Sequence, residues 1–589
     1  MIKPVPPAVI LIAGALLVPL FKGRVKKTYL LLLPALAFLD LLYMPAGKYW
    51  IVDFLSYELT FGRVDPLSMA FGYVFVLITF IGILYALHLE DDAQHMASLI
   101  YAGGALGVTF AGDLFSLYVF WEILAIASVF LILARKMSTS SAAAFRYFTW
   151  HFFGGLCLLA GIILYVIGRG TPEFSYIGLT DGASVLIFTG FCLNAAVFPL
   201  HAWLPDAYPR ATVTGAVFMS ALTTKSAVYI LARTFPGTEL LIWAGAFMTC
   251  FPIFYAVIVN DIRRVLAYSL VNQVGFMVCG IGIGTQLAIN GVVAHAFSHI
   301  IYKALLFMST GAVLYMTGRI RATDLGGLHK TMPFTAICCM IGAASISAFP
   351  LFSGFVSKSM TVAAAAEEHL TIIWLMLMFA SAGVFHHAGI KVPFFVFFGH
   401  DSGIRSKEPP INMRLAMGIA AFICIFLGIY PQPLYRILPY AVQYVPYTAF
   451  HVVGMLQLLM FGALAFTMLV LSGYYPPEMR AVNLDTDWFA RIFGRKFIWF
   501  CHAPLKRFGS RVEDSVSRIA GFFKTVPGRS VILENGTDSF FHSGLTSLPN
   551  LLFVWGKYLK TEIKQLSWNL AYILMPFFAL LALMLLWLS

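Results

Sequence analysis

The stretch His295-Ala-Phe-Ser-His299-Ile-Ile-Tyr-Lys303-Ala-Leu-Leu-Phe307 places three titratable side chains inside one long apolar segment. The three are spaced four residues apart, so in a helix they share one face. A charge near the centre of a bilayer costs between about 3 and 17 kcal/mol, so such groups persist where they line a wet cavity or relay ions. The segment therefore predicts a membrane helix that takes part in ion movement.

The same spacing has other interpretations. Two histidines four residues apart can bind a metal, or haem if a second pair lies on a facing helix, but no carboxylate or thiol is close in sequence. They can also be purely structural. Histidine titrates near neutral pH, as a proton relay requires, so we favour a relay.

Three further titratable residues, Glu122, Lys225 and Lys358, lie in other apolar segments. A glutamate there could exchange a proton or hold a cation, and a lysine could pass a proton to a neighbour. The alternatives are a glutamate that only bonds the helix backbone and a Lys225 that extends to the interface. That lysine would have to reach about 12 Å along its helix.

The composition is that of a polytopic membrane protein. Of 589 residues, 60% are hydrophobic and 11% are charged, whereas soluble domains have about 25% charged residues. The net charge of +12 resides in loops and near the C-terminus, which predicts cytoplasmic loops and contact with anionic lipid rather than nucleic acid. The eight cysteines form no CxxC pair, and nearly all lie in apolar runs, which is typical of core residues.

About 14 to 16 membrane helices are expected in an all-α fold, at about 20 residues each. The first apolar run is expected to be a retained span, with the N-terminus outside a prokaryotic plasma membrane. The approximate spans are 8–21, 29–46, 66–88, 97–112, 114–134, 147–168, 183–201, 211–233, 239–259, 266–284, 289–316, 334–364, 371–398, 412–432, 450–472 and 567–588.

Prolines interrupt two of the apolar segments, at Pro199 and Pro205 and again at Pro350. Proline removes a backbone donor, and irregular backbone survives in a membrane only where protein or water covers it. Broken segments in corresponding places of two halves indicate an inverted-repeat transporter. We therefore expect N-terminal helices over 1–95, one repeat over 96–260, a second over 261–400, and further core helices over 401–475.

Residues 476–566 are more polar and basic than the rest, with aromatic side chains between the charges. Segments 487–500 and 513–525 could form amphipathic helices on the membrane surface. We expect an arm on the cytoplasmic face, held by a terminal anchor helix over 567–589; a solvated basic linker is the alternative.

Several motifs together resemble the proton-conducting, antiporter-like subunits of complex I, membrane-bound hydrogenases and Mrp-type cation/proton antiporters, most of all the Mrp D subunit. The motifs are Gly112-Asp-Leu-Phe-Ser-Leu-Tyr-Val-Phe-Trp-Glu122, Pro199-Leu-His-Ala-Trp-Leu-Pro-Asp-Ala207, Leu222-Thr-Thr-Lys225, Asp261-Ile-Arg-Arg-Val-Leu-Ala-Tyr-Ser269, His295–Phe307 and Gly354-Phe-Val-Ser-Lys358. The resemblance covers roughly residues 60–400.

The resemblance implies a chain of half-channels. Glu122 would be the first-half carboxylate, Lys225 the first-half lysine and Lys358 the second-half lysine, with His295, His299 and Lys303 between them. The family usually has a lysine five residues before the Pro-Leu-His motif, where this chain has Asn194. Glu122 is therefore expected to face Lys225 or a metal cation. The remaining candidates are Asp113, Asn194, His201, Arg264 and Lys391, the last near a helix end where it could extend to the surface.

We therefore expect a subunit of an antiporter that exchanges Na⁺ or K⁺ for H⁺, with other membrane subunits and lipids as partners. No catalytic residue, metal site or cofactor of its own is expected. The alternatives are a proton-pumping subunit of a redox complex related to complex I or hydrogenase, a scaffold that conducts nothing, and a haem protein.

Overall fold

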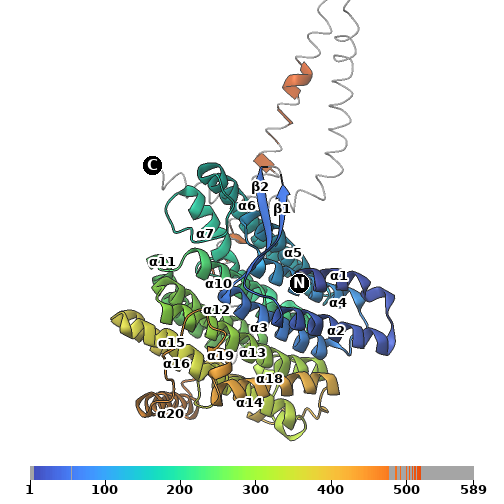
Figure 1. The fold of residues 1–589 in the computed structure, drawn as a ribbon. Helices are drawn as coiled ribbons and strands as arrows, with labels where there is room; N and C mark the ends of the chain where they lie inside the picture. The colour runs from blue at the N-terminus through green and yellow to red at the C-terminus, as the bar shows by residue number, and fades with distance from the viewer. Residues whose placement is uncertain are drawn as a thin grey trace, which may run out of the picture. The chain divides into compact units, whose positions relative to one another are not determined.

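The computed structural model describes residues 5–54 and 56–475, together with isolated positions between 484 and 518. Residues 5–475 belong to one compact unit, Met1–Asn483, which is almost entirely helical (Figure 1). The predicted anchor helix over 567–589 lies outside the described residues, and so does nearly all of the predicted arm over 476–566.

The described chain begins with three α-helices, one short 3₁₀ helix and a β-hairpin. The elements are α1 (Pro7–Leu17), η1 (Val18–Leu20), α2 (Gly23–Leu42), β1 (Gly47–Phe54), β2 (Tyr57–Val64) and α3 (Pro66–Ala86). The strands are antiparallel, with Gly47 opposite Val64 and Phe54 opposite Tyr57. The hairpin was not predicted from the sequence, which indicated only a loop between two spans.

Two sets of helices follow. The first set is α4 (Asp92–Phe110), α5 (Leu114–Leu133), α6 (Ser138–Arg169), α7 (Gly182–Asn194), α8 (Trp203–Ala207), η2 (Tyr208–Arg210), α9 (Gly215–Ala221) and α10 (Thr223–Thr234). The second set is α11 (Glu239–Ile258), α12 (Ile262–Ile283), α13 (Gln286–Thr317), η3 (Ala322–Asp324), η4 (Leu328–Lys330), α14 (Pro333–Ile346) and α15 (Ser353–Glu367).

The two sets repeat one pattern. Asp113 caps the N-terminus of α5, and Asp261 caps that of α12, each through its carboxylate. A helix of 32 residues follows in both sets, α6 and α13, and each ends at a left-handed glycine, Gly170 (φ +72°) and Gly318 (φ +69°). Glycine adopts this conformation without the Cβ clash that other residues meet. The short helices α7 and α14 then stop at the two predicted breaks.

The last elements cover one side of the unit. They are α16 (Thr371–Val384), the π-helical η5 (Phe385–Ile390), α17 (Lys391–Pro393), the π-helical η6 (Phe394–Phe398), α18 (Ile411–Ile429), α19 (Gln432–Tyr435) and α20 (Ala449–Leu471). Ten helices in the described part of the chain are long and apolar enough to cross a bilayer, and three shorter helices are also apolar. The all-helical membrane fold expected from the sequence is confirmed.

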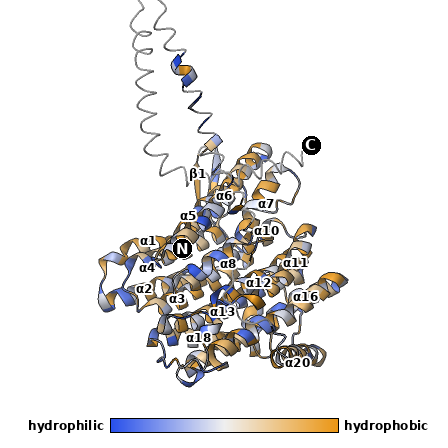
Figure 2. Cartoon of the chain, turned by 180° about the vertical axis from the view of Figure 1, so that it is seen from behind, coloured by the Kyte–Doolittle hydropathy of each residue, from blue (hydrophilic) through white to orange (hydrophobic). Residues whose placement is uncertain are grey.

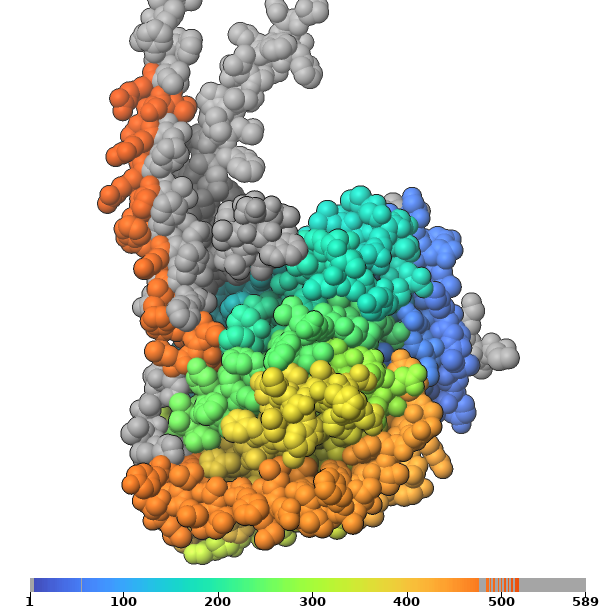
Figure 3. All heavy atoms as spheres, turned by 90° about the vertical axis from the view of Figure 1, so that its left-hand side faces the viewer, coloured from blue at the N-terminus to red at the C-terminus, as the bar shows by residue number. Residues whose placement is uncertain are grey.

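Burial separates central helices from peripheral ones. In the most apolar stretch of each helix, the share of residues that are buried is 100% for Gly215–Thr234 and 94% for α12, but 17% for α20. The ribbon of the outer helices is coloured mainly as hydrophobic in Figure 2, and α20 lies along one edge in Figure 3. The helices α10, α12 and α13 pack together at the centre, and their polar residues are therefore screened from solvent by other helices.

Ion pairs join the ends of neighbouring helices on both sides of the unit. Lys26 pairs with Asp92 at 3.0 Å, whereas Arg233 pairs with Asp65 at 2.7 Å near the opposite ends. Each pair joins segments that the distribution of lysine and arginine assigns to one side of the membrane. Burial raises the pKa of the Asp65 carboxyl, but two hydrogen bonds and the charge of Arg233 outweigh it and hold that pKa below its usual range.

Asp113 joins the hairpin to the start of α5. Its carboxylate accepts hydrogen bonds from the backbone N–H of Thr60 at 2.7 Å and from the N–H and Oγ of Ser116 at 2.8 and 2.6 Å. The buried Asp113 therefore caps helix α5 and also binds strand β2.

Asp113→Ala should lower stability by about 2–4 kcal/mol, because it removes an N-cap and leaves the buried N–H of Thr60 unpaired. The midpoint of thermal unfolding in detergent measures this effect. Asp53→Ala, at an exposed position of β1, is the control and should leave the midpoint in place. Equal midpoints for the two variants would refute the structural role of Asp113.

Candidate functional site

Lys225 lies at the junction of two short helices inside the unit. The helical ladder is interrupted at Leu222, between α9 and α10. The fully buried Lys225 donates from Nζ to the carbonyl of Ser220 at 2.7 Å and to the hydroxyl of Thr224 at 3.1 Å. The break therefore supplies a backbone acceptor for a lysine that reaches neither surface, so interfacial snorkelling does not occur.

Lys358 lies beside the second break. Helix α14 ends at Ile346, and α15 begins at Ser353 after the turn that contains Pro350. Lys358 donates to the carbonyl of Ile346 at 2.9 Å, and its Nζ lies 5.2 Å from the ring centre of Phe276. The C-terminal end of a helix carries partial negative charge, and an aromatic face attracts a cation, so both neighbours favour the charged ammonium.

Helix α13 carries His295, His299 and Lys303 on one face, as predicted, and all three are fully buried. Lys303 donates to Ser269 Oγ at 3.0 Å on α12, and His295 lies 3.5 Å from Ser357 Oγ on α15. Neither ring nitrogen of His299 has a hydrogen-bond partner within the described residues. An unpaired buried polar group costs about 1–3 kcal/mol, so bound water is the expected partner.

These groups form one electrostatic cluster. His299 is in electrostatic contact with Lys225, Lys303 and Lys358, and Lys225 with Lys303. Like charges that interact oppose one another, so protonation of one lysine disfavours protonation of the next. The arrangement can therefore hold fewer protons than it has sites, and it can pass a proton from one site to another.

Glu122 lies apart from this cluster, on α5. Its carboxylate rests so closely against Gly155 of α6 that a Cβ added to this glycine would overlap Oε1. That oxygen is buried and has no hydrogen-bond partner in the part of the chain that the structure describes. The structure thus places Glu122 beside α6, whereas Lys225 belongs to the central cluster.

The other predicted residues have varied positions. Asn194 is the last residue of α7 and is fully buried, and the ring of His201 packs against Phe251. Arg264 follows the cap of α12, with its guanidinium 5.9 Å from the ring centre of Tyr268. Lys391 is buried and donates to the carbonyls of Val257 and Val259 at the end of α11, so it does not extend to the surface.

Sequence reasoning missed the polar network around the histidines. Tyr302 donates to Gln273 at 3.0 Å, and the Gln273 amide donates to Asn272 at 2.5 Å. Two adjacent amides inside the apolar run of α12 were the available signal, because buried amides need partners. His151 of α6 was missed as well.

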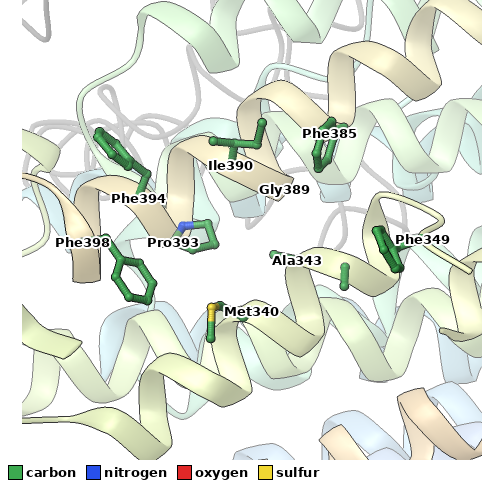
Figure 4. A pocket seen from close by; sticks show the side chains of 10 residues that line it. Met340, Ala343, Phe349, Phe385, Gly389, Ile390, Pro393, Phe394 and Phe398 are labelled. Carbon is green, nitrogen blue, oxygen red and sulfur yellow. The ribbon is translucent and has the colours of Figure 1, made fainter. Parts of the chain in front are cut away.

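An apolar cavity of about 330 Å³ lies between α14 and the π-helical segments. Met340, Phe349, Phe385 and Phe394 are among the residues that line it, as Figure 4 shows. None of the lining residues is titratable, so the cavity is separate from the cluster. Across residues 5–475 and the scattered positions beyond them, no three His, Cys, Asp or Glu residues gather as metal ligands would.

The fold and the buried cluster define a class: polytopic membrane proteins with broken helices and titratable groups at their centre. Residues 111–384 match the family described as NADH:quinone oxidoreductase/Mrp antiporter, transmembrane. The chain is 31% identical to the D subunit of the Na⁺/H⁺ antiporter of Alkalihalophilus pseudofirmus over 356 residues, which cover 56% of this chain and 72% of that protein. The chain belongs to this family, as the sequence motifs indicated.

Two further comparisons agree with this assignment. The A subunit of the same organism's Na⁺/H⁺ antiporter is 31% identical over 440 residues, which are 64% of this chain and 54% of that longer protein. The chain thus spans about half the length of that relative. A chain of the Mrp complex from Dietzia sp. has the same fold, with a TM-score of 0.66 and 21% identity, over 73% of this chain and 95% of that one.

Gly354→Ala should disturb the break that holds Lys358. The added Cβ would overlap the carbonyl oxygen of Ser345, which is backbone and cannot rotate away. We expect a loss of stability of about 1–3 kcal/mol, seen as a lower midpoint of thermal unfolding in detergent. Gly418→Ala meets only Phe334 at 3.5 Å and is the control. Equal midpoints for the two variants would contradict the close contact between Gly354 of α15 and Ser345 of α14.

Proposed function

We propose that the chain is the ion-translocating membrane subunit of a multisubunit antiporter that exchanges Na⁺ or K⁺ for H⁺ in a prokaryotic plasma membrane. The observation that carries the proposal is the buried cluster of Lys225, His299, Lys303 and Lys358. The relatives named above are subunits of Na⁺/H⁺ antiporters, which favours this activity. Other membrane subunits and lipids are the proposed partners.

The proposed mechanism depends on repulsion inside the cluster. A proton that arrives at Lys225 disfavours the charge on Lys303, whose proton can leave through His299 or His295. Lys358, held by the carbonyl of Ile346, receives the next proton. Movement of charge at one end thus changes proton occupancy at the other, which can be coupled to entry of a cation.

We further propose that residues 96–260 and 261–400 are inverted repeats, with 1–95 and 401–475 packed around them. The repeated capping aspartates, 32-residue helices and glycine ends support this division. In the corresponding topology the N-terminus lies outside, and α5 and α12 enter the membrane from opposite faces.

A second candidate function is that of a proton-pumping subunit in a redox complex, since the family description names NADH:quinone oxidoreductase as well. Everted vesicles distinguish the two. An antiporter releases a preformed proton gradient when Na⁺, K⁺ or Li⁺ is added, and requires its companion subunits; a redox-complex subunit moves protons only when an electron donor is supplied.

Lys358→Ala should reduce cation-dependent proton release about tenfold or more, because it removes a positioned proton carrier. The measurement is the initial rate of recovery of a pH-sensitive dye in everted vesicles, normalised to the amount of protein in the membrane. Lys407→Ala, at an exposed loop position, should keep the original rate. Unchanged transport in Lys358→Ala would favour the scaffold alternative.

A further inference from the structure

Helix α6 carries a buried histidine that no part of the proposed pathway uses. His151 is 1% exposed, and its ring packs 4.1 Å from the ring of Tyr147 and 4.6 Å from that of Trp203. It faces the amide of Asn194 on α7. Within the described residues no well-formed hydrogen bond reaches either imidazole nitrogen or either amide atom, although the two side chains interact. That one contact can satisfy at most one atom of each side chain, so at least one imidazole nitrogen and one amide atom remain open.

These unpaired atoms indicate a site rather than packing. Leaving a buried donor or acceptor unpaired costs about 1–3 kcal/mol, so a purely structural histidine would be expected to have a partner. Here an imidazole, an amide and the nearby carboxylate of Glu122 are all left with open hydrogen-bonding positions. Water is the ligand that suits a polar space of this kind.

The polar groups follow one face of α6. Tyr147, His151 and Gly155 are spaced four residues apart, so they lie one above another along the helix. Glu122 rests against Gly155, Asn194 faces His151, and the hydroxyl of Tyr147 lies 3.5 Å from that of Thr223 at the start of α10. This face spans about 12 Å between Glu122 and the helix that carries Lys225.

The repeat pattern gives His151 a counterpart. Counted from the capping aspartates, His151 has the same place after Asp113 as His299 has after Asp261. By the same count Tyr147 corresponds to His295, and Gly155 to Lys303. The long helix of the first set thus carries a histidine at the position where the long helix of the second set carries His299.

We propose that His151 is a proton carrier that connects Glu122 to Lys225; this inference rests on the proposed transport function. Protonated Glu122 gives its proton through water to the neutral imidazole, leaving a carboxylate and an imidazolium. The imidazolium releases a proton to the hydroxyls of Tyr147 and Thr223, which pass one on to the unprotonated amine of Lys225.

Few other charged groups face this histidine. Helices α5, α7 and α8 and the segment η2 pack on α6. Apart from Glu122, they contribute Tyr118, Cys192 and Tyr208. They also contribute Asp206, which is paired with Arg146 at 2.7 Å and also bonded by Arg210. Glu122 is therefore the unpaired carboxylate available to exchange a proton with His151 in this part of the described structure.

The test measures cation-dependent proton release in everted vesicles that contain the full chain and its companion subunits. His151→Gln should lower the initial rate about tenfold or more, whereas His369→Gln, at an exposed position, should keep it. Asn194→Lys in the His151→Gln background should recover at least a third of the rate, because a proton carrier then faces the same space. A structural role would not be rescued from another helix.

Tyr147→Phe removes the hydroxyl that is proposed to accept the proton from His151 and leaves the ring in place. This variant can be measured even if the His151→Gln protein does not accumulate in the membrane. It should slow transport at least threefold, while Tyr165→Phe on the same helix should not. Normal rates in His151→Gln, a loss that Asn194→Lys does not restore, or a normal rate in Tyr147→Phe would each overturn the inference. If Lys358→Ala is impaired in the same vesicles, the proposed function stands independently; if it too is normal, both fall.

Discussion

The central constraint is that an ammonium group inside an apolar protein needs oxygen acceptors, and most backbone carbonyls there are already used by helices. The chain meets this need by ending helices inside the membrane domain. Lys225 takes the carbonyl of Ser220 next to the interruption at Leu222, and Lys358 takes that of Ile346 at the end of α14. Lys391 also binds carbonyls at the end of a helix, although α11 ends at a loop between two spans and not at an internal break. The breaks and the lysines therefore depend on each other.

Much of this could be predicted from the sequence, because the signals are local. Their position in apolar runs located Lys225 and Lys358, Pro350 marked the break beside Lys358, and helical spacing placed His295, His299 and Lys303 on one face. The interruption at Leu222 beside Lys225 has no proline and was not predicted. What could not be predicted depends on packing between distant segments. Lys391 appeared close enough to a helix end to reach the surface, yet three-dimensional packing buries it against α11. His151 has no charged neighbour at helical spacing, and only the approach of α7 places Asn194 beside it.

The two sets of helices share a framework but differ in chemistry. Both have a capped entry helix followed by a long helix with a polar face. The face of α13 carries Lys303, whereas the corresponding position of α6 is Gly155, which leaves room for the carboxylate of Glu122. A negative group in one half and a positive group in the other thus occupy related positions. The proposed route therefore begins at an acidic group, Glu122, and ends at a basic group, Lys358.

The β-hairpin has a mechanical consequence. A two-stranded sheet has little stability of its own, and this one is fastened by Thr60, whose N–H binds Asp113 and whose carbonyl accepts from Gly112, and by Arg63, which donates to the carbonyl of Phe174. These attachments grip the first turn of α5 and the segment just after α6. The hairpin consequently fixes the start of α5 relative to the segment that follows α6, and these are the two helices between which the carboxylate of Glu122 lies.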